Sequence, residues 1–98
     1  MNIKIHSIHF DADSKLLEFI DQKVKKLQLF YDNIISTEVF LRLEKVQDME
    51  NKIVEIKLEI RGNDMFAKKQ SKTFEEATDL AIEALRRQLI KHKTKISR

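Results

Sequence analysis

The sequence predicts an α+β domain of order β-α-β-β-β-α, in which two helices pack on one face of a four-stranded sheet. Two observations predict it. Apolar residues alternate with polar ones in four short segments, and they recur at spacings of three and four in two longer segments. The 98 residues include no Pro and one Gly, so we expect no linker and a single domain.

The first strand and the first helix occupy the N-terminal third of the chain. Ile3 and Ile5 alternate with polar neighbours, which is the period of a half-buried strand. Asp13 is the expected N-cap of a helix over residues 14–31, which Asp32 and Asn33 bring to an end. The apolar face of that helix is formed by Leu16, Ile20, Val24, Leu27 and Tyr31.

Two strands that form a hairpin are predicted next. In the first of them Val39, Leu41 and Leu43 share one side, and their polar and aromatic neighbours share the other. The third strand of the chain, Val54–Ile60, has the clearest alternation of all. The polar segment Gln47–Asn51 between them is short enough for a hairpin connection.

A fourth strand and a long last helix complete the domain. Gly62 supplies the positive φ that a tight turn needs, and Met65–Ser71 returns as the fourth strand. Thr73 and Glu76 have the spacing of a capping box. The helix then runs to about His92 or beyond, and its small residues favour close packing on the sheet. The residues that follow one helical stripe are Phe74, Ala77, Ala81, Ala84, Leu85, Gln88 and Leu89.

Basic residues are concentrated at the C-terminal end of the last helix. Of the 19 Lys and Arg residues, six lie within Ala84–Arg98, where there is no Asp or Glu, and 13 precede them together with all 16 acids. A helix end that is amphipathic and strongly basic indicates a phosphate-binding surface. The six are Arg86, Arg87, Lys91, Lys93, Lys95 and Arg98, with His92 among them.

Helical spacing sorts these cations into two rows. Arg87, Lys91 and Lys95 form one ridge, and Arg86 and Lys93 lie on the other flank of the apolar stripe. Cations near a helix C-terminus also stabilise the macrodipole, which would account for one or two of them. Ordinary solvated helices mix charges of both signs, so the sequence favours phosphate binding.

Other surface residues allow more than one interpretation. On the first helix Lys15, Lys23 and Lys26 lean to one side, and they would add to the basic surface if that side lies next to the Arg87 ridge. Aromatic residues on the open sheet face, Phe40 and Phe66, could stack on bases or form a self-association patch. Basic residues near the strands either extend the positive field or protect an edge strand from aggregation: Arg42, Arg61, Lys68, Lys69 and Lys72.

Catalytic and metal chemistry has no recognisable residue pattern here. The chain has no Cys, its three His residues are scattered, and one Gly cannot form a phosphate-binding loop. We therefore expect no enzyme activity, no metal and no cofactor. The N-terminus lacks the apolar stretch of a signal peptide and no run reaches membrane-spanning length, so we expect a cytoplasmic protein without a membrane partner.

The segment from Arg87 to Lys95, Arg-Gln-Leu-Ile-Lys-His-Lys-Thr-Lys, resembles a family pattern. It is similar to the RQL-x-KHK-x-K helix end of the ribosome hibernation-promoting factors, relatives of ribosome-associated inhibitor A. Phe19-Ile20 with Lys23, Lys26-Leu27, the run from Tyr31 to Ile34 and the run from Val39 to Val46 agree in order and spacing. The resemblance spans nearly the whole chain and has the same order of elements.

The resemblance implies a stress or stationary-phase factor that represses translation. Members of the family bind the small ribosomal subunit in the channel between head and body, where they contact ribosomal RNA and cover positions of messenger and transfer RNA. Carried over by position, the RNA-facing residues would be Lys23, Lys26, Arg86, Arg87, Lys91, His92, Lys93 and Lys95, although relatives vary at Arg86.

Two features depart from the family pattern. Thr73-Phe74-Glu75 stands where relatives often have Asp-Met-Tyr, and Lys69 replaces a small residue. The resemblance implies one ribosome-binding domain over residues 1–98, without the C-terminal dimerisation domain of the long forms. Two alternatives remain: a double-stranded-RNA-binding domain, which the acidic start of the last helix disfavours, and a protein-interaction module acting through the open sheet face.

Overall fold

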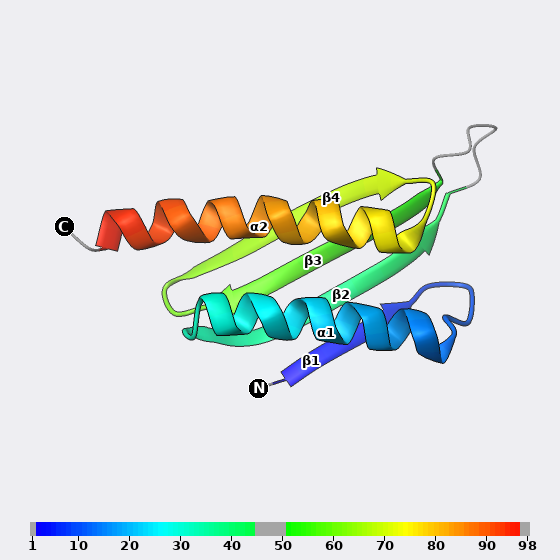
Figure 1. Cartoon of the computed structure of the whole chain (residues 1–98), viewed down its shortest axis with the longest axis horizontal. Helices are drawn as coiled ribbons and strands as arrows, with labels where there is room; N and C mark the ends of the chain where they lie inside the picture. Colours follow the sequence, from blue (N-terminus) through cyan, green and yellow to red (C-terminus); the bar gives the residue numbers. More distant parts are fainter. Residues whose placement is uncertain (1, 45–50, 97–98) are drawn as a thin grey trace.

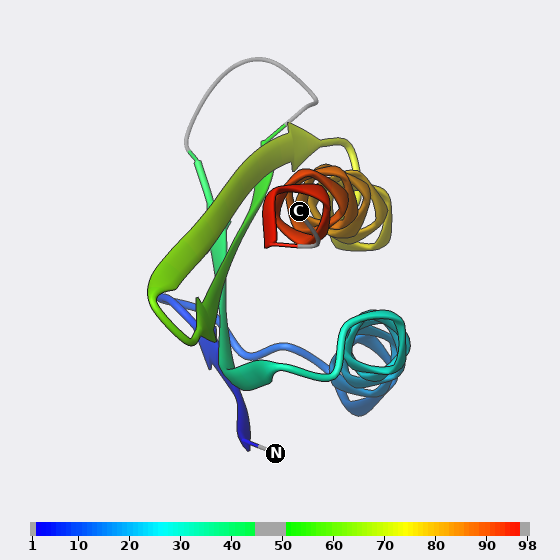
Figure 2. The ribbon, with the colours of Figure 1, turned by 90° about the vertical axis from the view of Figure 1, so that its left-hand side faces the viewer.

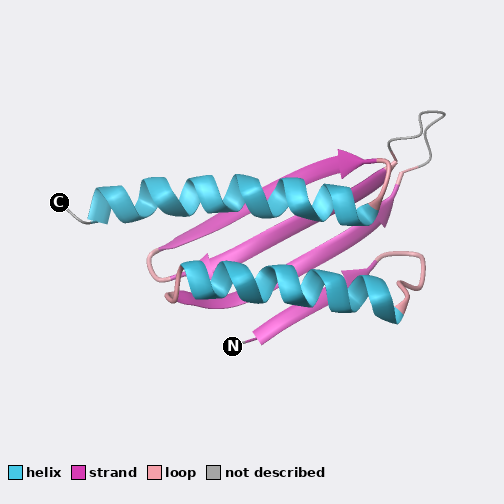
Figure 3. Cartoon of the chain, viewed as in Figure 1, coloured by secondary structure: helices cyan, strands magenta, loops and turns pink. Residues whose placement is uncertain are grey.

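The computed structural model describes residues 2–44 and 51–96, with the side chains of the last helix described through Lys93. It confirms the predicted α+β order (Figures 1 and 3). The elements are β1 (Asn2–Ser7), α1 (Ser14–Phe30), β2 (Ile34–Leu43), β3 (Lys52–Ile60), β4 (Asn63–Ser71) and α2 (Phe74–Ile96).

The four strands form one mixed sheet in the order β1-β2-β3-β4. Strand β1 pairs with β2 in parallel, so α1 is the crossover between them, and the other two pairings are antiparallel. Both helices lie against the same face of the sheet (Figure 2). The predicted connection Gln47–Asn51 lies, except for Asn51, outside the described residues.

The core fills the space between the helices and the sheet. Its helical side includes the predicted face of α1, with Ile20 and Val24 fully buried, and Tyr31 just after the helix is 6% exposed. Predicted inward residues of the sheet, such as Val39 and Ile56, are also fully buried. Leu43 is nevertheless 46% exposed, because it is the last residue of β2 and lies at the end of the strand.

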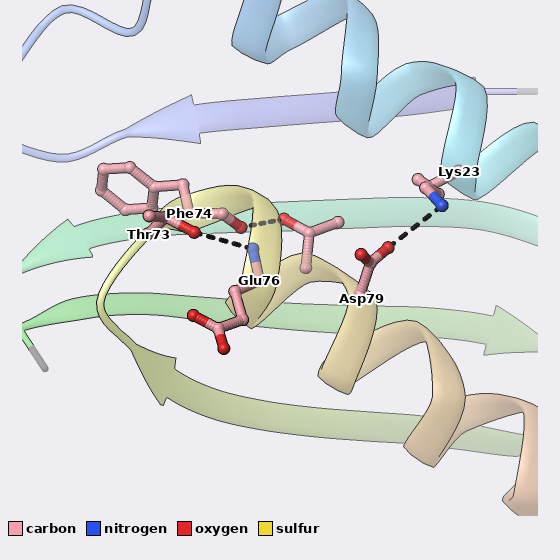
Figure 4. A network of polar contacts seen from close by, with 6 residues as sticks. Lys23, Thr73, Phe74, Glu76 and Asp79 are labelled. Carbon is pink, nitrogen blue, oxygen red and sulfur yellow. Dashed lines mark hydrogen bonds and ion pairs between the residues drawn. The ribbon is translucent and has the colours of Figure 1, made fainter.

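The predicted turn and cap residues take the expected roles. The Asp13 carboxylate accepts a 2.8 Å hydrogen bond from the Leu16 N–H. At the start of α2 the Thr73 hydroxyl accepts a 3.0 Å bond from the Glu76 N–H (Figure 4). Gly62 has φ of 81° in the turn between β3 and β4. These local signals fix where both helices begin and where the chain turns between β3 and β4.

Strand β2 begins earlier than the alternation of its sequence indicates. It starts at Ile34, which is 3% exposed and pairs with Ile60 of β3. The register shifts between Ile34 and Ser36, so the inward positions before and after the shift do not follow one period of two. This irregularity explains why alternation alone located only the second half of β2.

Candidate nucleic-acid interface

Helix α2 carries its basic end beyond the sheet. Its first half lies close to the strands because Ala77 and Ala81 are small and fully buried. At 1.5 Å per residue its 23 residues extend over about 35 Å. The C-terminal turns consequently project past the β3–β4 turn and past the end of α1 (Figure 1). Lys91 and Lys93 precede this projecting part: Lys91 lies by Asn63 and Asp64 of the β3–β4 turn, and Lys93 Nζ lies 5.6 Å from the Phe30 ring at the end of α1.

A groove separates one flank of α2 from α1. It has a volume of about 550 Å³, and its apolar lining is Leu27 and Phe30 of α1 with Ile82 of α2. Charged residues of both signs line it as well: Lys23 and Lys26 from α1, and Asp79, Glu83 and Arg86 from α2. The groove therefore combines an apolar floor with charged walls.

Two cations of α2 lie against one aromatic ring of α1. The guanidinium carbon of Arg86 is 4.9 Å from the centroid of the Phe30 ring, and Lys93 Nζ is 5.6 Å from it. These are cation–π distances. The second row predicted from the sequence is therefore a real cluster, and it rests on the end of α1. We call Lys23, Lys26, Arg86 and Lys93 the groove cations.

The other flank of α2 faces β4. Gln88 Nε2 donates a 3.0 Å hydrogen bond to the carbonyl oxygen of Phe66, which ties this flank to the strand. Lys91 lines a shallow hollow of about 230 Å³ together with Asn63 and Asp64 of the β3–β4 turn. Arg87 is largely exposed. We call Arg87 and Lys91 the β4-side ridge.

Lys95 is the next position of this ridge in sequence spacing, four residues after Lys91. Helix α2 continues through Ile96, so the backbone at Lys95 is helical. The side chain of Lys95 lies outside those that the structure describes, and Arg98 lies outside the described residues altogether. The predicted ridge is therefore observed over its first two members.

The lysines of α1 lie next to Arg86 and not next to the Arg87 ridge, so the condition for their adding to that ridge is not met. Lys23 and Lys26 line the groove with Arg86, on the opposite flank of α2. Successive helical residues point about 100° apart, so Arg86 and Arg87 leave the helix in different directions. Because Gln88 directs the Arg87 flank toward β4, the Arg86 flank meets α1.

Carboxylates pair with some of the predicted site residues. Lys23 Nζ lies 3.1 Å from Asp79 Oδ1 (Figure 4), and an Arg87 guanidinium nitrogen lies 3.3 Å from Glu83 Oε1. Both pairs are partly exposed, where such pairs stabilise by about 0–1 kcal/mol, so phosphates can replace them. Within residues 2–44 and 51–96, Lys26, Arg86 and Lys91 form no ion pair with a carboxylate. The charges of these three residues are therefore not offset by a paired carboxylate.

His92 lies nearer to the core than the neighbouring lysines. Its half-buried ring meets Tyr31 edge to face, with centroids 6.1 Å apart and planes at 73°. Tyr31 follows α1 directly and caps its C-terminus. The His92 side chain therefore packs α2 against the end of α1, which leaves His92 less open to a ligand than Lys91.

The open sheet face carries its own contacts. Arg42 pairs with Glu55 at 2.6 Å, and their side chains are 43% and 12% exposed, so a neighbouring carboxylate offsets the charge of Arg42. Phe40 stacks on His6 with centroids 4.9 Å apart, and Phe66 is 52% exposed. The two aromatic residues predicted for this face are thus on it, although His6 covers part of Phe40.

The part of the chain that the structure describes contains neither a candidate metal-binding cluster nor a helix that could span a membrane. Those residues include no group of three or more His, Cys, Asp or Glu side chains placed to hold a metal ion. Neither described helix is long and apolar enough to cross a membrane. The distinguishing feature is the basic end of α2 with its two flanks.

This arrangement of strands and helices with a basic last helix has a counterpart among known families. The sequence profile of the family described as Sigma 54 modulation protein / S30EA ribosomal protein matches residues 3–97. The chain belongs to this family. The match includes the groove cations, the β4-side ridge and Lys95.

Several members of the S30EA family are similar along the whole chain. A ribosome hibernation promoting factor of Azotobacter vinelandii is 30% identical over 97% of this chain and 85% of its own length. The factor of that name from Escherichia coli is 30% identical over 98% of this chain and 97% of its own. A ribosome hibernation promotion factor of Bacillus subtilis is 29% identical, and this chain spans 51% of it.

Solved structures share the S30EA fold. A ribosomal subunit interface protein from Coxiella burnetii superposes with a TM-score of 0.86 at 24% identity, over 96% of this chain and 99% of that one. The N-terminal domain of Protein Y from Thermus thermophilus gives a TM-score of 0.76 at 20% identity, over 90% of this chain and 94% of that domain. These likenesses confirm the four-stranded sheet with two helices.

Proposed function

We propose that this protein is a ribosome hibernation factor that binds the small ribosomal subunit and represses translation in the cytoplasm during stress or stationary phase. The names of its S30EA relatives support a ribosome-associated hibernation role. The observation that carries the site is the C-terminal half of α2, which presents cations on both flanks. Residues 1–98 act in this proposal as one ribosome-binding domain.

The proposed mechanism is steric occlusion of the channel used by messenger and transfer RNA. The domain is elongated, with extents of 47 × 24 × 18 Å, and its basic rod end lies at one end of the long axis. A cationic rod of this shape suits a cleft whose walls are phosphate-rich ribosomal RNA. Once seated, the folded domain excludes other RNA from the space it fills, and no chemical step is needed.

Duplex RNA alone is a poorer candidate ligand. The first turn of α2 contains Glu75 and Glu76, and Asp79 follows one turn later. A double-stranded-RNA-binding domain uses basic residues at that end of its last helix, whereas here carboxylates would face the phosphates. In a competition experiment we expect small subunits to displace the protein from isolated duplex RNA.

Reversal of the ridge charges tests the proposal. The variant carries Arg87→Glu, Lys91→Glu and Lys95→Glu, and a matched control carries Lys4→Glu, Lys25→Glu and Lys57→Glu, which changes the net charge equally elsewhere. Because Arg87 and Lys91 are exposed and lie outside the core, circular dichroism should show both variants folded. We expect the first to lose co-sedimentation with small subunits and inhibition of translation, and the control to keep both. A folded ridge variant that still binds would refute the assignment.

A further inference from the structure

Phe30 is uncharged, so the pattern of basic residues in the sequence does not point to it. It is the last residue of α1, is half-buried, and packs on the edge of the core. Its ring lies within 4.9 Å of the Arg86 guanidinium carbon and 5.6 Å of Lys93 Nζ. One apolar side chain thereby contacts two cations of the proposed RNA-binding surface.

Arg86 and Lys93 both reach the Phe30 ring from α2. Arg86 and Lys93 are seven residues apart, which places them on one flank of α2 about 10.5 Å apart along its axis. Both side chains are long and lose much rotamer freedom when a ligand fixes them. The negative face of an aromatic ring attracts both, so it can restrict them before the ligand arrives.

We propose that Phe30 is a positioning residue that holds Arg86 and Lys93 as a preformed pair for neighbouring phosphates of one RNA strand lying along the groove between α1 and α2. This proposal rests on the proposed function and specifies that the Arg86 flank of α2 binds phosphates of a single RNA strand. Lys26 lines this groove together with Arg86 and adds a third cation, and Lys93 adjoins the groove at Phe30. Leu27 and Ile82, which line it too, make the floor over which the backbone of the strand would pass.

A purely structural role for Phe30 makes a different prediction. If the ring served only to cover the core, any apolar side chain of similar size would replace it. If it orders the cations, the replacement must keep an aromatic face. Phe30→Leu removes that face and keeps apolar contact, whereas Phe30→Tyr keeps it, so the two variants separate the roles.

The experiment is a double-mutant cycle read by binding. Affinities for purified small ribosomal subunits, and separately for oligouridine RNA, are measured for wild type, Phe30→Leu, Phe30→Tyr, the pair Arg86→Gln with Lys93→Gln, and that pair combined with Phe30→Leu. We expect Phe30→Leu to weaken binding about two- to fivefold, the size of one exposed cation–π contact, and Phe30→Tyr to bind as wild type. Phe30→Leu should have no further effect once both cations are gone.

A second measurement reports on the cations without any RNA. In NMR spectra the ring current of Phe30 should displace the side-chain methylene resonances of Arg86 and Lys93, in wild type and Phe30→Tyr but not in Phe30→Leu. Equal losses from Phe30→Leu with and without the two cations, or unshifted resonances in wild type, would overturn the positioning role. Failure of wild type to bind subunits would instead overturn the proposed function, and oligouridine binding with NMR would still decide the role of Phe30.

Discussion

Lys23 of α1 and Asp79 of α2 form an ion pair across the groove between the two helices, with 3.1 Å between Nζ and Oδ1 (Figure 4). The Lys23 ammonium also lies 5.3 Å from the centroid of the Phe19 ring. The side chains of the pair are 33% and 53% exposed. Lys23 therefore ties the helices together in the free protein, and a phosphate must compete with Asp79 to bind it.

Asp79→Asn should strengthen RNA binding. The change removes a negative charge from the groove and releases Lys23, so we expect affinity for small subunits to rise by up to about tenfold at low salt, with less gain at high salt. Because the pair is exposed, the free energy of unfolding should fall by at most about 1 kcal/mol. Filter binding at two salt concentrations and urea denaturation measure the two effects. Weaker binding would show that Asp79 itself supports the contact with RNA.

Lys26 and Lys25 offer a matched comparison on α1. Lys26 lines the groove, whereas Lys25 pairs with Asp21 at 2.8 Å and does not line it. Lys26→Gln should reduce the magnitude of the slope of log affinity against log salt by about 0.7–0.9, the value for one phosphate contact. Lys25→Gln should leave the slope unchanged. Equal effects of the two substitutions would mean that net charge, and not the groove, governs binding.

The order of elements and the start of each helix could be predicted because they depend on local signals. Asp13 and Thr73 cap helices through bonds to residues three positions away. Alternation identified β3 because Val54–Ile60 keeps one period throughout. The same reasoning found only the second half of β2, since the register shift near Ser36 breaks the period.

The arrangement of the site could not be predicted in the same way, because it depends on how α2 is rotated against the rest of the fold. Helical spacing separated Arg86 from Arg87 correctly but did not say which of them faces α1. The pairing of Lys23 with Asp79, and the contact of Phe30 with two cations, join residues more than fifty positions apart. Nothing in the local pattern around Phe30 distinguishes it from an ordinary core residue.

Ala81→Leu should destabilise the fold by about 1–3 kcal/mol. Ala81 is fully buried where α2 packs on the sheet, so a larger side chain must push the helix outward. The neighbouring Leu80 is 47% exposed, and Leu80→Ala serves as a control expected to change stability by less than about 1 kcal/mol. Urea denaturation measures both. If Ala81→Leu were as stable as wild type, close packing of α2 would not be what fixes its direction.

Phe66→Ser tests whether the open sheet face is the binding surface. Phe66 is 52% exposed there, and its carbonyl, which accepts the Gln88 bond, is kept in the variant. If binding depends on α2, affinity for small subunits should stay within about twofold of wild type, because no phosphate contact is lost. The log–log salt slope should also remain steep, on the order of −4 to −7 for six to eight cations. A large loss of affinity in Phe66→Ser, together with binding that survives high salt, would instead place the partner on the sheet and make the protein an interaction module.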